Sequence, residues 1–363
     1  MSVDIGIIGL AKSGKTTVFN ALTGVKADMA SQTPQIGVTK VPDYRFYGLA
    51  QMLHPKRIVF TEVRFIDIGA STRSVGGSRG IDGRLLVELS SVDVLIAVVR
   101  AFIDESIPHV EGSLDIKRDI ATIGMEIAVS DLAIIERRLV RIDESLKGAK
   151  QPDHQYLLRE QEMLVKIRGS LEKDVPVRQL SFSLDDIRLI AGYHFLTAKP
   201  LLILVNIGEE RLPQAPSLEA QLNSQYSRPK CQVITLCGKL ETELAQLDEA
   251  AAREFRAEFN LEESGRDRAL NLSYALLGIV SFFTIASDEV RSWLVPRGTT
   301  ALKAAGKIHS DMERGFIRAE VISYGELVRC GSLAEARRKG LLRLEGKNYV
   351  VQDGDVITFL FNI

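Results

Sequence analysis

The chain has 363 residues, of which 45% are hydrophobic, and its formal net charge is −1. This length favours two or three domains that bury their own cores. The balanced charge argues against a protein coated with positive charge for a polyanion, so any contact with nucleic acid must be local.

The cysteine pattern and the N-terminus narrow the class further. Cys231, Cys237 and Cys330 form no CxxC pair, which argues against a structural zinc site and a disulfide scaffold. Residues 1–4 lack a basic signal region, and no apolar stretch is long enough to span a bilayer. The sequence therefore predicts a cytoplasmic protein without a membrane partner.

The first predicted elements are an apolar strand over residues 3–8, a glycine-containing loop and a helical run over residues 17–22. The loop, residues 9–16, reads GLAKSGKT and matches the GxxxxGK[ST] phosphate-binding pattern. In this pattern Lys15 reaches the β- and γ-phosphates, and the Thr16 hydroxyl binds Mg²⁺. The alternative is a glycine-rich turn that holds no ligand. The residues expected to contact the nucleotide here are Gly9, Ala11, Lys12, Ser13, Gly14, Lys15, Thr16 and Thr17.

A second strand, residues 63–67, ends in Asp67, where nucleotide hydrolases place a carboxylate that holds Mg²⁺ through water. Residues 68–83 are rich in glycine and show no apolar period, which is typical of a loop. Apolar runs at 92–99, 201–206 and 232–236 predict further strands. Near-continuous apolar strands are typical of a parallel sheet that helices cover on both faces. The sequence thus predicts an α/β nucleotide-binding domain.

Between two of these strands, a seam of apolar residues at three- and four-residue steps predicts a long helix. Residues 147–152 interrupt the seam and a second helical run resumes it, so we expect an antiparallel helical hairpin. Its charged outer faces are either solvated or docked on a partner. The seam residues are Leu132, Ile135, Leu139, Ile142, Leu146, Leu157, Leu164, Ile167 and Leu171.

The order of these motifs resembles the YchF family, the Obg-like ATPases of the translation-factor class of P-loop hydrolases. The resemblance includes residues 206–209 (NIGE) at a strand end, and residues 282–284, 289–293, 298–301, 315–321 and 349–356 resemble the family's TGS domain. It implies a nucleotide-binding domain in two parts, residues 1–115 and 196–279, with the helical coiled-coil insertion at 116–195 between them. It also implies a C-terminal β-grasp (TGS) domain at 280–363.

The TGS resemblance implies contact with a ribosome or another RNA-containing partner. Residues 290–363 contain 12 Lys and Arg against 8 Asp and Glu, which is consistent with a weak positive potential. The alternative is a β-grasp domain whose charges only keep it in solution.

The base-binding motif departs from the NKxD pattern of guanine-binding relatives. Ile207 removes the lysine that covers the base, and Glu209 is one methylene too long to meet guanine in register. The pattern resembles the family's NxxE, which implies ATP, with Asn206 and main-chain groups near Ile207 reading the adenine. Cys237 and Gly238 stand where related proteins use backbone amides against the base. Alternatively, Glu209 only forms a cap or a salt bridge, which leaves base choice loose.

Several positions around the γ-phosphate also depart from the pattern. Ala70 takes a glycine position, and Ser71 takes the position of a water-orienting Gln or an apolar residue. Aligning residues 36–38 with the family places Ser31 as a further Mg²⁺ ligand. Lys12 replaces the asparagine that relatives use with potassium, so its ammonium could serve in place of that ion. The alternative is a lysine that points to solvent.

The remaining candidate for catalysis is His109. The resemblance implies a role in hydrolysis, since a neutral imidazole can hydrogen-bond an attacking water. The alternative is a loop histidine with a structural hydrogen bond. The sequence therefore predicts a slow ATPase whose nucleotide state controls its association with a ribosome or RNA-containing partner. A non-hydrolytic nucleotide sensor or scaffold, or a GTPase that prefers GTP, remains open.

Overall fold

The structure is a computed structural model that describes residues 3–25, 34–41, 43–67, 81, 83–148, 150–259, 261–286 and 289–362. Its contacts divide the chain into two compact units. The first unit comprises the described parts of residues 3–39 and 64–276, and the second comprises the described parts of 40–63 and 277–362. Across these described residues, no helix is long and apolar enough to cross a membrane.

The first unit is built on a sheet with strand order β2-β4-β1-β5-β6-β7. The pairs β1–β5, β5–β6 and β6–β7 are parallel, with Ile5 opposite Val94 and Leu95 opposite Leu201. Every residue of β5 and β6 is buried, as expected of inner strands between helices. The strands are β1 (Val3–Gly9), β2 (Gln35–Lys40), β4 (Glu62–Asp67), β5 (Val94–Ala101), β6 (Leu201–Ile207) and β7 (Cys231–Leu236).

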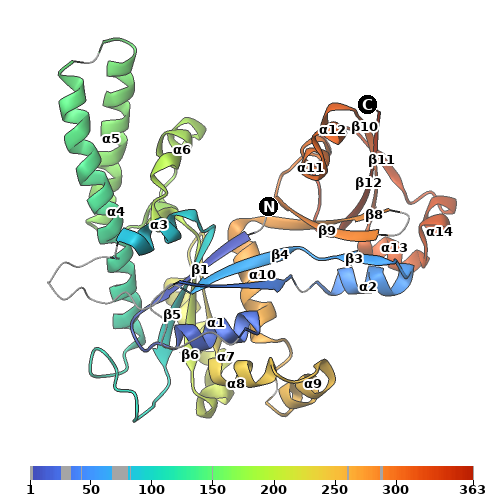
Figure 1. Cartoon of the computed structure of the whole chain (residues 1–363), viewed down its shortest axis with the longest axis horizontal. Helices are drawn as coiled ribbons and strands as arrows, with labels where there is room; N and C mark the ends of the chain where they lie inside the picture. The colour runs from blue at the N-terminus through green and yellow to red at the C-terminus, as the bar shows by residue number, and fades with distance from the viewer. Residues whose placement is uncertain are drawn as a thin grey trace. The chain divides into compact units, whose positions relative to one another are not determined.

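Helices surround this sheet, with α1 against α8, α4 against β5 and α7 against β7 (Figure 1). The α-helices are α1 (Lys15–Thr23), α3 (Gly83–Ser91), α4 (Ile116–Leu146), α5 (Asp153–Leu171), α6 (Leu184–Ile190), α7 (Ala215–Tyr226), α8 (Gly238–Leu244), α9 (Glu249–Glu258) and α10 (Gly265–Leu277). Short 3-10 helices complete the unit: η1 (Val177–Gln179), η2 (Ala191–Tyr193), η3 (Leu196–Ala198) and η4 (Glu209–Gln214). The predicted α/β class with its largely parallel sheet is confirmed.

Helices α4 and α5 run side by side as a long antiparallel pair (Figure 1). Their shared core contains all nine residues of the predicted seam, either buried or partly buried. A buried carboxylate ties this pair to the rest of the unit: Asp131 on α4 accepts hydrogen bonds from the N–H groups of Leu196 (2.9 Å) and Thr197 (2.8 Å). Burial raises the pKa of Asp131 to about 6.

The second unit is a mixed sheet with strand order β11-β10-β12-β8-β9-β3. One apolar cluster includes Ala301, Ala304 and Ala305 of α11, and another includes residues of α2, α13 and α14. The strands are β3 (Arg57–Val59), β8 (Ile279–Ile285), β9 (Glu289–Pro296), β10 (Phe316–Ser323), β11 (Arg343–Glu345) and β12 (Asp355–Phe361). The helices are α2 (Tyr44–Leu53), α11 (Ala301–Ile308), α12 (Ser310–Arg314), α13 (Tyr324–Cys330) and α14 (Leu333–Arg338).

Residues 40–63 differ from the predicted domain boundaries, which placed them in the nucleotide-binding domain. They belong to the second unit because β3 adds to β9 as a parallel edge strand and α2 packs into the second unit's core. Arg45 also forms a 2.8 Å ion pair with Asp353. These partners lie more than two hundred residues apart in sequence, so no local pattern indicates the pairing.

Candidate functional site

The predicted phosphate loop connects β1 to α1, and its two glycines are required by its shape. Gly9 has φ +151°, and a Cβ there would lie 2.4 Å from the carbonyl oxygen of Val98. Gly14 has φ +88°, and a Cβ there would lie 2.3 Å from Nδ2 of Asn206. Both positions therefore exclude side chains on steric and conformational grounds. The loop opens onto the N-terminus of α1, where free N–H groups favour anions.

Lys15 is the buried cation of this loop, with 6% of its surface exposed. Its Nζ donates hydrogen bonds to the carbonyl oxygens of Gly9 (3.0 Å) and Leu10 (2.9 Å). Burial lowers the pKa of Lys15 to about 8, although the negative charges of Asp67 and Glu126 act in the opposite direction. The ammonium is thus held on the loop itself, where an anionic ligand would compete for it.

Thr16 and Asp67 meet beside this lysine. The Thr16 hydroxyl donates a 2.9 Å hydrogen bond to Oδ2 of Asp67. The other carboxylate oxygen, Oδ1, is buried and has no hydrogen-bond partner within the described part of the chain. Burial raises the pKa of Asp67, because the charged form is desolvated. A hydroxyl and an unsatisfied carboxylate oxygen are hard oxygen donors that suit Mg²⁺, so these residues fit the predicted metal.

Other positions predicted around the γ-phosphate cannot be placed in this way. Ser31, Ala70 and Ser71 lie outside the described residues.

Asn206 forms a bridge between two predicted binding segments. Its Nδ2 donates to the carbonyl oxygen of Ser13 (3.2 Å), and its Oδ1 accepts from the N–H of Gly238 (3.0 Å). The side chains of Ile207 and Cys237 are buried in the core of the unit, at 2% and 4% exposure. At these two positions the main chain, rather than the side chain, is the group available to a base.

Glu209 follows β6 and forms a 3.0 Å ion pair with Lys239. The two side chains are 44% and 73% exposed, so water screens their attraction. From the sequence, a salt bridge of this kind was the alternative to a role of Glu209 in selecting the base. The pair is exposed enough for a ligand to displace it.

The remaining loop residues are placed as follows. Lys12 is exposed and has φ +61°. The hydroxyl of Ser13 is buried and has no partner in the described segments. Ala11 is partly exposed, and the carbonyl oxygen of Thr17 accepts a 3.1 Å hydrogen bond from Thr242. Among the described residues, the exposed Lys12 side chain makes no ion pair that would hold it at the phosphates or away from them.

His109 makes its hydrogen bonds to its own loop and to helix α4. Its Nε2 lies 2.9 Å from Oδ2 of Asp119, and its Nδ1 accepts a 3.1 Å hydrogen bond from the N–H of Glu111. The imidazole is 7% exposed and the Asp119 side chain 2%. The structure therefore brings together Lys15, Thr16, Asp67, Asn206 and Gly238, whereas His109 is hydrogen-bonded to Asp119 of α4.

The structure also reveals residues that the sequence did not indicate. Glu126 on α4 contributes negative charge at Lys15, Asp119 holds His109, and Lys239 pairs with Glu209. The two acids stand on the first half of α4, two helical turns apart, which places them on one stripe of the helix. The two acids share this face of α4 with the buried Ile123 and Ile127, and that position is the only sequence signal that could have marked them.

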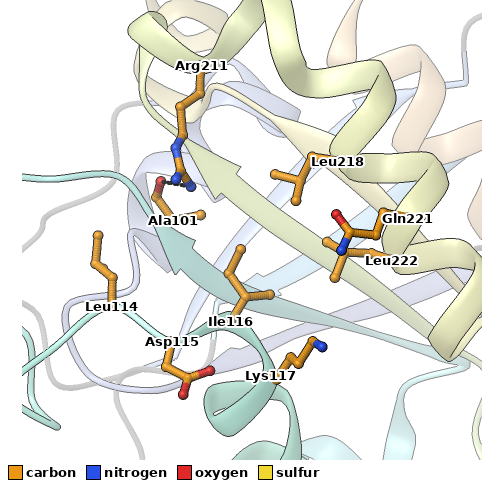
Figure 2. Close-up of a pocket in the computed structure, with 9 residues that line it drawn as sticks. All are labelled: Ala101, Leu114, Asp115, Ile116, Lys117, Arg211, Leu218, Gln221 and Leu222. Carbon is orange, nitrogen blue, oxygen red and sulfur yellow. Dashed lines mark hydrogen bonds between the residues drawn. The ribbon is translucent and has the colours of Figure 1, made fainter.

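A separate cavity of about 290 Å³ lies at the carboxyl end of β5. Figure 2 shows its walls: the first turn of α4, one face of α7, and Arg211, which reaches the carbonyl oxygen of Ala101 at 3.4 Å. None of its lining residues belongs to the phosphate loop. The cavity is therefore distinct from the phosphate site.

Two family models match parts of this chain. A family model described as 50S ribosome-binding GTPase matches residues 4–134. A model of the C-terminal part of YchF GTPases, described as a protein of unknown function, matches residues 279–362.

Similar proteins extend over the whole chain. The "Ribosome-binding ATPase YchF" of Bacillus subtilis is 38% identical over 370 residues, covering 100% of both chains. The protein of that name from Escherichia coli O157:H7 is 35% identical, again with full coverage. The solved structure of the Schizosaccharomyces pombe YchF GTPase has a TM-score of 0.84 at 30% identity, and covers 99% of this chain and 98% of that one. The chain therefore belongs to the YchF family.

Proposed function

We propose that this chain binds ATP and hydrolyses it slowly, and that its nucleotide state controls association with the ribosome. The arrangement of Lys15, Thr16 and Asp67 is the observation that carries the proposal. It combines a buried cation for the phosphates with oxygen donors for Mg²⁺ at the start of a helix. The names of the bacterial relatives, which call them ribosome-binding ATPases, support the same reading.

Each residue has a role in this proposal. Lys15 leaves its carbonyl partners to contact the β- and γ-phosphates, and Thr16 with Asp67 would hold Mg²⁺. When bound, the metal supplies positive charge that offsets the charge of the phosphates. Asn206 keeps the phosphate loop and the segment at Gly238 in register. His109 would hold the attacking water, for which it must leave Asp119.

The preference for ATP rests on the base-binding segment. With Ile207 in the core, no lysine stem is available at this position to cover a purine. Glu209, engaged with Lys239, does not present the short carboxylate that reads guanine in NKxD proteins. Both features favour adenine, read by main-chain groups. A preference for GTP would instead require Glu209 to leave Lys239 and accept guanine protons.

The partner surfaces that we propose are the α4–α5 hairpin and the TGS domain at residues 280–363. The hairpin presents exposed basic side chains, including Arg137, Arg141, Lys147 and Lys150. Positive groups of this kind contact phosphate backbones without reading sequence. Association through them should weaken as salt rises.

Single-turnover hydrolysis of labelled ATP and GTP tests the enzymatic part of the proposal. We expect the unaltered protein to hydrolyse ATP and to bind GTP less tightly than ATP. The Lys15→Ala variant should lose both ATP binding and ATP hydrolysis. Tight ATP binding without hydrolysis would favour the sensor or scaffold alternative. Sedimentation with ribosomes tests the partner, and equal binding with ATP, ADP and no nucleotide would contradict nucleotide control.

A further inference from the structure

The loop that carries His109, residues 103–115, connects β5 to α4, the first helix of the hairpin. At its start, a Cβ on Gly14 would lie 3.6 Å from the Phe102 ring, so this ring borders the phosphate loop. Arg100 fixes that ring by stacking 4.5 Å over it and by donating to the carbonyl oxygen of Phe102 (3.2 Å). At its end, Asp115 caps α4 by accepting from the N–H of Arg118 at 3.0 Å. The loop therefore spans the nucleotide site and the hairpin's first helix.

Both ring nitrogens of His109 are used in this arrangement. Because Nδ1 accepts the N–H of Glu111, the imidazole proton lies on Nε2, which donates to Asp119. Each ring nitrogen makes one hydrogen bond, so no lone pair or N–H remains for a water molecule.

Asp119 is itself held in place by Arg118. Its Oδ1 accepts from Nε (3.0 Å) and Nη2 (2.8 Å) of Arg118, while Oδ2 faces His109. The same guanidinium donates to the carbonyl oxygen of Ser113 at 2.7 Å, so it also closes the end of the His109 loop. The carboxylate is therefore a rigid, buried acceptor whose hydrogen bond to the imidazole is little weakened by water.

We propose that Asp119 is a positioning residue that withholds His109 from the nucleotide, so that the hairpin helix controls when hydrolysis occurs. The inference rests on the proposed role of His109 in hydrolysis. Its physical basis is that Asp119 and the hairpin core are on the same helix, α4, which Asp131 also anchors to the first unit. A partner that shifts α4 changes the Asp119–His109 contact directly.

The test compares single-turnover ATP hydrolysis, without and with ribosomes, in the full-length chain. Asp119→Ala should raise the ribosome-free rate on the order of tenfold, because it removes a charged hydrogen bond that favours the withheld state. Adding His109→Ala should abolish that rise. Stimulation by ribosomes should shrink by the same factor, since the variant is already released. Asp143→Ala, which removes an exposed acid from the same helix, is the matched control and should leave the ribosome-free rate unchanged.

Because a buried acid is removed, Asp119→Asn provides a milder second variant. Its amide oxygen still accepts from Nε2 but carries no charge, so it should raise the rate less and in the same direction. Nuclear magnetic resonance of ¹⁵N-labelled histidine should show the Nε2–H tautomer of His109 in the nucleotide-free protein. In Asp119→Ala it should show that the hydrogen bond from Nε2–H is lost. If His109→Ala slows hydrolysis but neither Asp119 variant accelerates it, the withholding role is wrong. If His109→Ala leaves the rate unchanged, the catalytic role itself is wrong.

Discussion

The two ends of the proposed nucleotide site are built in different ways. At the phosphate end, Lys15 and Asp67 are buried, and their hydrogen bonds are made to the loop's own backbone and to Thr16. At the base end, Glu209 and Lys239 form an exposed ion pair that water screens. Buried hydrogen bonds are costly to break, whereas exposed ion pairs are weak. Under the proposed function, phosphate binding would thus rest on buried groups of the fold, and base choice on weak interactions.

The largest effect should come from removing the buried cation. Lys15→Ala should lower the single-turnover rate of ATP hydrolysis about 10³-fold, because a preorganised charge at the phosphates is lost. Rapid-quench measurements would check this. Lys147→Ala removes an exposed lysine from the far end of α4 and should leave the ribosome-free rate unchanged. If Lys15→Ala lowers the rate of hydrolysis less than tenfold, the phosphate end does not make the largest contribution to hydrolysis.

Alanine substitutions at Gly14 and Gly24 distinguish the effect of steric crowding from the effect of backbone strain. Gly14 and Gly24 both have positive φ, but a Cβ meets Asn206 at Gly14 and nothing within 4 Å at Gly24. Each alanine substitution should cost about 1–2 kcal/mol in free energy of unfolding from the left-handed backbone. Only Gly14→Ala should also weaken ATP binding, by about 100-fold, as it displaces the bridging amide. Thermal unfolding and calorimetry measure the two effects, and equal ATP affinities would contradict the bridging role.

Alkaline pH should weaken the phosphate end. With its pKa lowered from 10.5 to about 8, Lys15 loses its proton as the pH rises through about 8 in the nucleotide-free protein. Because ATP favours the charged lysine, binding should take up a proton there, and affinity should fall by up to about tenfold per pH unit. The same shift means that rising pH between 8 and 10.5 stabilises the nucleotide-free fold through this group, since the unfolded chain then binds more protons.

Calorimetry at pH 7 and pH 9, in buffers of different ionisation enthalpy, measures that proton uptake. Lys15→Arg is the control, because arginine stays charged over this range. If the arginine variant takes up the same number of protons, a group other than Lys15 is responsible for the proton uptake.

The smallest effect should be at the base end. Glu209→Asp should shift the preference towards GTP by only a few-fold, since it shortens the carboxylate and weakens an exposed ion pair. Titration calorimetry with ATP and GTP gives the ratio of affinities, with Glu210→Asp as the neighbouring control. The unaltered protein binding GTP more tightly than ATP would overturn the adenine assignment. Ile207→Lys is unsuitable as a partner change, because it would place an ammonium in the core.

The sequence by itself determined the elements whose signal is local. A strand, a glycine loop and a helix are contiguous at residues 3–23, so their pattern is readable without knowledge of the rest of the fold. The apolar seam of the hairpin is equally local, since each helix repeats its own spacing. The acid at the end of β4 could be predicted for the same reason.

Tertiary structure alone decided which distant groups meet. No periodic sequence pattern indicates three of these contacts. They are the pairing of β3 with β9, the hydrogen bond between Asp119 and His109, and the ion pair between Glu209 and Lys239. Hydrogen bonds and ion pairs depend on distances of about 3 Å between atoms that folding brings together. A single sequence encodes such distances only through the complete packing, and for that reason it indicated a histidine for hydrolysis without showing what holds it.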